Sequence, residues 1–116
     1  MQDVETTVNE IKALIAQFIK ERDWEQFHSP KNLSMAIAIE AAELMEMFQW
    51  MTVDEAVAQS KQPELRSRIE EEIADIAIYV LSLCNTLGLD LSAAISSKIE
   101  KNRNKYPKEA CKGKWR

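Results

Sequence analysis

The sequence contains few of the residues that interrupt regular structure. Its 116 residues include two glycines, three prolines and two cysteines, while 46% are hydrophobic. Scarce glycine and proline favour long helices joined by short connections. No stretch alternates between apolar and polar residues in the way that a strand with one buried face does. The sequence therefore predicts an all-α fold with a single core, which a chain of this length can build.

Further absences concern cellular location and metal chemistry. Cys84 falls in an apolar stretch and Cys111 in a polar one, so the two cysteines predict neither a disulfide framework nor a zinc site. No apolar run reaches the roughly 20 residues needed to span a bilayer. Residues 1–10 are acidic and polar, unlike a secretory signal. We therefore expect a reduced, cytoplasmic protein without membrane contact.

Charge is distributed unevenly along the chain. Residues 98–116 contain eight Lys and Arg against two Glu, a net charge of +6, whereas residues 1–97 carry a net charge of −10. A basic final segment beside an acidic body suits phosphate binding next to a metal cluster, although a solvated basic tail would have the same composition. The acidic body argues against nucleic acid as a partner.

Hydrophobic spacing and capping residues divide the chain into helices. The expected helices span residues 3–21, 30–51, 53–60, 63–87 and 91–105. Ser29, Thr52 and Asp90 are typical of positions just before a helix, and Gly88 is typical of a helix end. Residues 1–107 then form one domain, a four-helix-bundle-like fold with a short extra helix. Residues 108–116 are expected to form a basic, flexible tail.

The segment Ile39–Glu46 carries carboxylates within a helix that is otherwise apolar nearly all round. Such a helix is normally buried, and carboxylates are rarely buried unless they pair with cations or bind a metal. Glu40 and Glu43 share one helix face, and Glu72 and Asp75 share a face of another apolar helix. Antiparallel packing of the two helices would gather all four carboxylates. Oxygen ligands without sulfur or imidazole favour Mg²⁺, with Mn²⁺ as an alternative.

The segment between the first two expected helices, residues 22–32, is rich in aromatic and hydrogen-bonding side chains. It contains Trp24, Phe27 and His28, which is the only histidine of the chain. Aromatic faces stack on nucleobases, and polar side chains such as His bind base edges. We expect ligand contact for Trp24 and a loop-anchoring role for Phe27. Trp50, near the end of the next helix, has three possible roles: core, interface or base stacking.

These segments together resemble a known family. Ile-Glu-Ala-Ala-Glu at 39–43, followed after 28 residues by Glu-Ile-Ala-Asp at 72–75, is similar to the paired acidic signature of the MazG-type nucleotide pyrophosphohydrolases. The likeness to the dCTP pyrophosphatase branch extends to residues 22–28, 48–50 and 97–107. Many members of the family carry a further Glu where this chain has Ile39, and the dCTP branch also lacks that acid.

The resemblance implies a fold, a reaction and a site. Family members hydrolyse a nucleoside triphosphate between its α and β phosphates, giving a monophosphate and pyrophosphate, and the branch implies dCTP or a modified dCTP in nucleotide-pool cleansing. The implied metal ligands and catalytic residues are Glu40, Glu43, Glu72 and Asp75. The implied base and sugar contacts are Trp24, His28, Trp50 and Tyr79, and the implied phosphate or sugar contacts are Lys98, Asn102 and Arg103. Among the acids, Glu43 is our candidate for the general base.

Other interpretations of the same residues stay open. A di-iron carboxylate bundle would need Glu-x-x-His pairs, and no His follows either acidic pair. A non-catalytic helical bundle that binds nucleotides would carry the same residues and would differ only in turnover. The acids would also fit a solvated helix face, although the apolar residues around Glu40 and Glu43 argue against this.

The second expected helix predicts self-association. It carries more large apolar side chains than one core face can use, namely Met35, Met45, Met47, Phe48, Trp50 and Met51. Large exposed apolar surfaces mark sites of protein–protein contact. We therefore expect a homo-oligomer, either a dimer or a tetramer built as a dimer of dimers, with sites completed by a neighbouring subunit.

Overall fold

The computed structural model describes residues 1–114, and every regular element in this part of the chain is helical. The elements in chain order are α1 (Val8–Glu21), the 3₁₀ turn η1 (Glu25–Phe27), α2 (Pro30–Glu46), α3 (Val53–Gln59), α4 (Pro63–Leu87), α5 (Leu91–Lys105) and α6 (Lys108–Cys111). The predicted all-α fold class is confirmed.

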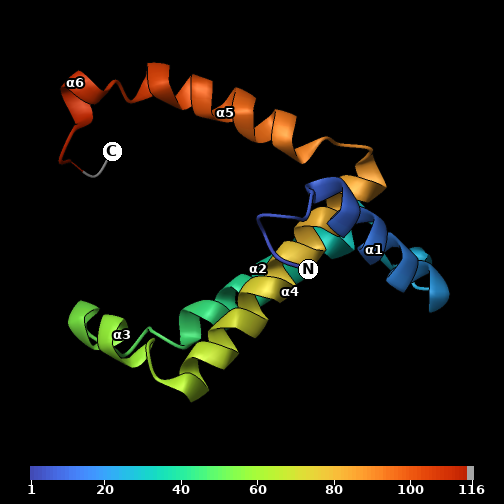
Figure 1. Cartoon of the computed structure of the whole chain (residues 1–116), viewed down its shortest axis with the longest axis horizontal. Coiled ribbons are helices and arrows are strands. Elements are labelled where there is room, and N and C mark those ends of the chain that lie inside the picture. Colours follow the sequence, from blue (N-terminus) through green and yellow to red (C-terminus); the bar gives the residue numbers. More distant parts are fainter. Residues whose placement is uncertain (115–116) are drawn as a thin grey trace.

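The packing of α2 against α4 forms the centre of the fold. The two helices lie side by side and run antiparallel (Figure 1). The start of α2 meets the end of α4, where the Thr86 hydroxyl donates to the carbonyl of His28 at 3.3 Å. Near the middle of both helices, Glu40 of α2 approaches Glu72 of α4. This pairing places the acidic segment of one helix against the acidic segment of the other, as the sequence predicts.

A small core lies where α1 packs against α4. Ile15 and Ile19 of α1 and Leu81 of α4 are buried together, and Leu33 of α2 is only 2% exposed. Burial of each such side chain contributes about 1.5–3 kcal/mol to folding. Other large apolar side chains remain exposed, including Ile73, Ile78, Ile95 and Ile99. A single chain therefore leaves much apolar surface available for a further contact.

The helix α5 runs away from the rest of the molecule. The chain bends by 102° between α4 and α5, and α5 lies apart from the α2–α4 pair (Figure 1). Gly88, with φ 66°, ends α4 in the left-handed region that glycine adopts without steric cost. The Asp90 side chain then caps α5 by accepting from the N–H of Ala93 at 2.8 Å. Within one chain, this fourth long helix does not close a bundle with α1, α2 and α4.

No single helix among residues 1–114 is long and apolar enough to cross a membrane. The pair α4 and α5 reaches that length and composition only when taken together, across the bend between them.

The first helix begins later than the sequence predicts. The expected start was residue 3, but α1 starts at Val8. Thr7 caps the helix, because its hydroxyl oxygen accepts from the N–H of Glu10 at 3.1 Å. Val4 is 98% exposed, so no packing favours an extension of α1 toward the N-terminus.

Two further differences concern α2 and the C-terminal segment. The predicted second helix reached residue 51, but α2 ends at Glu46. The chain then tightens into turns, in which Phe48 donates to the carbonyl of Met45 and Met51 to that of Phe48. Residues 108–111 form the short helix α6 where a flexible tail was expected. Residues 115–116 of that predicted tail lie outside the described residues.

Replacing Gly88 by Ala should lower the free energy of unfolding by about 1 kcal/mol, because an L-residue is strained in the left-handed region. No atom lies within 4 Å of an added Cβ, so the loss comes from backbone conformation alone. Urea unfolding followed by circular dichroism measures it. Gly88→Asn is the matched control and should lose less, because Asn tolerates this conformation. Equal losses in the two variants would contradict the explanation.

Candidate functional site

Three carboxylates meet where α2 and α4 face each other. Glu40 and Glu43 come from α2, and Glu72 comes from α4. One oxygen from each of the three side chains lies within 4.8 Å of the others. Glu40 and Glu72 are half-buried and Glu43 is exposed, so the acidic cluster formed by these three residues opens to solvent on one side. The structure thus brings together three of the four acids that the sequence singles out.

The fourth acid, Asp75, is not part of this group. It lies one turn beyond Glu72 on the same face of α4 and is half-buried. The same face carries polar side chains on to the end of the helix, namely Tyr79, Ser82 and Thr86. We call the five α4 residues from Glu72 to Thr86 on this face the polar stripe, and it joins the acidic cluster to the segment around His28.

The acidic cluster lacks a proton donor. The Oε2 atoms of Glu40 and Glu72 are buried and have no hydrogen-bond partner among residues 1–114. Ionised carboxylates offer only acceptors, so their approach is unfavourable until a proton or a cation lies between them. The neighbouring Glu72 carboxyl, then burial and the nearby Glu43 carboxylate, raise the pKa of Glu40 from 4.5 to about 7.

The carboxylate oxygens of the acidic cluster are suitable ligands for a hard divalent cation. A divalent cation would neutralise the charge on both buried oxygens at once, whereas one proton shared between them leaves a net negative charge. Three carboxylates without a thiolate or imidazole favour metals that prefer oxygen ligands. The geometry therefore supports a divalent metal site on the α2–α4 contact.

His28 lies at the other end of the polar stripe. Its Nδ1 is 3.0 Å from the Oγ of Ser82, which is buried at 3% exposure. Its ring lies beside that of Tyr79, with the centroids 6.5 Å apart and the planes inclined by 38°. A cavity of about 370 Å³ opens next to His28 and is also lined by Ala16, Ile19, Glu25, Ser82, Asn85 and Thr86.

Sequence reasoning missed Ser82 and Thr86. Both continue the face of α4 that begins at Glu72, at intervals of ten and fourteen residues. That spacing is a usable signal, because small hydroxyl side chains in an otherwise apolar helix face a polar partner when they are buried. The partner, His28, follows the 3₁₀ turn η1, and no helical periodicity links it to α4.

The structure does not place all of the aromatic residues predicted to surround a nucleobase near one another. Trp24 lies edge-on against Phe18 of α1, with the ring centroids 5.9 Å apart, and remains 44% exposed. Trp50 is 89% exposed in the turns after α2. The 17 residues of α2 separate it from His28 by roughly 25 Å. Phe27 is 58% exposed, so the prediction that it anchors the loop is wrong.

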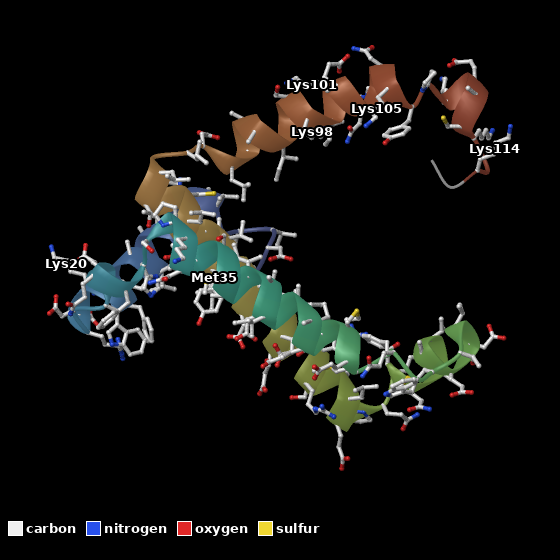
Figure 2. The ribbon with its side chains drawn as sticks, turned by 180° about the vertical axis from the view of Figure 1, so that it is seen from behind. Lys20, Met35, Lys98, Lys101, Lys105 and Lys114 are labelled. Carbon is white, nitrogen blue, oxygen red and sulfur yellow. The ribbon has the colours of Figure 1, made fainter. Side chains whose placement is uncertain are left out.

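The basic residues of the predicted site are not near the acidic cluster within one chain. Lys98, Asn102 and Arg103 belong to α5, and Figure 2 shows Lys98 on that helix, well apart from α2, where Met35 is labelled. Arg103 forms an ion pair with Glu100 of the same helix at 2.9 Å. Lys98 is exposed and Asn102 is half-buried. These three side chains therefore contact neither the cluster nor His28 in the single chain.

Comparison with known proteins identifies the family. The sequence matches the MazG-like family over residues 35–114. This chain belongs to that family. The match includes the acidic cluster, the polar stripe and α5, and the family predicted from the paired acidic motifs is confirmed. Trp24 and His28 lie before the matched range.

Individual relatives of this MazG-like chain are closely similar to it. It is 42% identical over 109 residues to dCTP pyrophosphatase 1 of Rattus norvegicus and 44% identical over 103 residues to dCTP pyrophosphatase 1 of Homo sapiens. The alignments cover 94% and 89% of this chain, but only 64% and 61% of those proteins. A pyrophosphatase from Archaeoglobus fulgidus has a similar crystal structure, with a TM-score of 0.82 and 37% identity over 92% of this chain and 98% of that one.

The metal-free protein should lose stability as the pH rises from about 4.5 to about 7, because folding raises the pKa of Glu40. The Glu40 contribution is fully present below pH 4.5 and is lost as the pH rises through about 7. Thermal unfolding with a chelator at pH 5 and pH 8 measures this, with Glu40→Gln as the reference that cannot ionise. The wild-type Tm should fall relative to the variant at pH 8. A difference in Tm that is the same at both values would contradict the prediction.

Magnesium should stabilise the wild-type protein more at pH 8 than at pH 5, because a proton and a cation compete for the same carboxylate oxygens. The measurement is the rise in Tm on addition of MgCl₂ at each pH. Glu40→Gln should show a smaller rise at pH 8, since it removes one charged ligand. A rise that is equal at both pH values, or equal in the variant, would mean that the ion binds elsewhere.

Proposed function

We propose that this protein is a metal-dependent nucleoside triphosphate pyrophosphohydrolase. It would cleave the bond between the α and β phosphates and release a nucleoside monophosphate and pyrophosphate. The observation that carries this proposal is the acidic cluster, with its two buried and unpartnered oxygens, in a chain of the MazG-like family. The names of the mammalian relatives support dCTP, or a modified dCTP, as the preferred substrate.

In this proposal Glu40, Glu43 and Glu72 hold Mg²⁺, with Asp75 as a further ligand on the same face of α4. Mn²⁺ is the alternative ion, because it prefers the same oxygen ligands. The ion supplies charge neutralisation on the phosphate oxygens and orientation of the attacking water. Glu43 is the carboxylate most open to solvent, which makes it our candidate to accept the proton of that water.

The polar stripe orients the substrate along α4. Ser82 is ten residues beyond Glu72 on one face, which corresponds to about 15 Å along the helix. This distance is comparable to the length of an extended nucleoside triphosphate. The phosphates then lie at the acidic cluster, Tyr79 lies beside the sugar, and His28 reaches the nucleobase. Trp24, exposed near the same end, provides an aromatic face for the base.

The active form in this proposal is a homo-oligomer, either a dimer or a tetramer built as a dimer of dimers. Trp50 is too far from His28 to line the same base pocket within one chain, and α5 extends away from its own acidic cluster. A second copy would remove both difficulties by placing its own Trp50 near His28 and its α5, with Lys98, Asn102 and Arg103, over the phosphates. A cavity of about 450 Å³ is lined only by apolar residues of α1, α2, α4 and α5, among them Val8, Leu44 and Ile76. Apolar side chains of a second copy could pack into this cavity.

With MgCl₂, the purified protein should release pyrophosphate and dCMP from dCTP faster than it hydrolyses the other common nucleoside triphosphates. Glu72→Gln should lower kcat by roughly 100-fold, because it removes a metal ligand. Glu70→Gln is the matched control, since Glu70 lies two residues away, is exposed and pairs only with Arg66. Release of orthophosphate in place of pyrophosphate would exclude α–β cleavage. Nucleotide binding without turnover would favour a non-catalytic nucleotide-binding bundle.

Mixing two inactive variants should restore activity if each site uses two copies. Glu72→Gln damages the acidic cluster and Lys98→Ala damages α5, so a mixed dimer has one site with both defects and one with neither. Co-refolded in equal amounts, the pair should regain about a quarter of wild-type activity, because half of the dimers are mixed. Glu40→Gln mixed with Glu72→Gln is the control and should regain none. No recovery in the first mixture would place both groups in one chain.

A further inference from the structure

The proposed function gives no role to the contact between Ser82 and His28. Ser82 is the only polar residue among residues 1–114 that is fully buried, at 3% exposure. A buried hydroxyl lowers stability unless it is hydrogen-bonded, and the Ser82 Oγ lies 3.0 Å from Nδ1 of His28. This contact joins residues 54 positions apart in the sequence and is the only hydrogen bond of the His28 ring among residues 1–114.

The surrounding hydrogen bonds favour one direction for the bond between Ser82 and His28. Thr86 donates to the carbonyl oxygens of both His28 and Ser82, at 3.3 and 3.0 Å. The Ser82 hydroxyl hydrogen has no other acceptor within the described part of the chain, and buried hydroxyl groups keep their hydrogens bonded. With Ser82 as the donor, Nδ1 is the unprotonated nitrogen, and the proton of neutral His28 lies on Nε2.

We propose that Ser82 is a positioning residue that holds His28 as the Nε2–H tautomer, so that the ring donates to an acceptor on the Watson–Crick edge of the substrate's base. This inference rests on the proposed function, because it places His28 at the nucleobase. Cytosine has an acceptor at N3, whereas thymine has an N–H there. A ring held as a donor thus favours cytosine over thymine, while a ring free to exchange tautomers discriminates less.

The fold supports such a role with three contacts from one helix. Ser82 forms a hydrogen bond with the ring, Thr86 with the backbone carbonyl, and Tyr79 lies beside the ring. All three belong to α4, which also carries Glu72 of the acidic cluster. The base contact and the metal site therefore share one rigid element, and the distance between them is fixed by the helix rather than by a loop.

Isotope labelling tests the tautomer directly. His28 is the only histidine, so ¹⁵N-histidine labelling reports this ring alone. At pH 8, where a free imidazole is neutral, the full-length protein should show a protonated Nε2 and an unprotonated Nδ1. Ser82→Ala should give a mixture of tautomers, and Ser82→Thr, which keeps the hydroxyl, should restore the wild-type pattern. A wild-type ring protonated at Nδ1 overturns the proposal.

Kinetics with dCTP, dTTP and MgCl₂ test the role in base recognition. Ser82→Ala should raise KM for dCTP about three- to tenfold, which corresponds to the loss of one hydrogen bond. It should change kcat less than KM, and it should reduce the preference for dCTP over dTTP. Ser34→Ala is the control, because that hydroxyl bonds only to the Lys31 carbonyl on the exposed side of α2. A changed tautomer with unchanged KM and unchanged preference overturns the proposal.

A product titration separates this inference from the proposed reaction. Adding dCMP should shift the Nε2–H signal of His28 in the wild-type protein and shift it less in Ser82→Ala. This readout does not need turnover, so a protein that fails to hydrolyse dCTP and still shows the shift would refute the reaction and support the base contact. The absence of any shift in the wild-type protein overturns the base contact, whether or not dCTP is hydrolysed.

Discussion

The contact between Glu40 and Glu72 is the constraint on which the rest of the site depends. Each contributes a buried carboxylate oxygen without a donor, and like charges at such a distance repel each other unless a proton or cation intervenes. The contact between α2 and α4 along their length holds the pair together despite this repulsion. The fold therefore keeps two carboxylates in an arrangement that is unfavourable when both are ionised and no cation is bound. Such an arrangement is typical of sites selected for binding rather than for stability.

The long helix α4 organises the molecule around that contact. It spans Pro63–Leu87, packs against both α1 and α2, and presents the polar stripe along one face. Because a helix is rigid over this length, Glu72 near its middle and Ser82 near its C-terminal end keep a constant separation. Loop residues such as His28 gain a defined position only through their bonds to this helix. Recognition near the C-terminal end of α4 and charge near its middle are thus parts of one element.

The sequence was sufficient where local rules decide the structure. Acids spaced by three residues within apolar helices identified the acidic cluster, and Thr52 and Asp90 were correctly predicted to start helices. The remaining features of the fold and the site depend on tertiary packing, which local sequence rules do not give. The spacing that groups Glu72 with Asp75 does not say which carboxylate turns toward Glu40. Gly88 marks the end of α4, but no local rule gives the direction in which α5 continues. A serine in an apolar helix, such as Ser82, also resembles a small core residue until its partner is known.

The direction of α5 also gives the chain a pronounced electrical asymmetry. The basic residues of α5 and α6 project from an acidic body instead of folding back onto it (Figure 1). Opposite charges that stay apart within one molecule produce a large dipole moment, and two such molecules attract each other over several ångströms before they touch. Association of two copies would therefore be steered from a distance and would slow as added salt shortens the screening length. In the proposed homo-oligomer, the bend at the end of α4 would thus affect the rate of association as well as the shape of each copy.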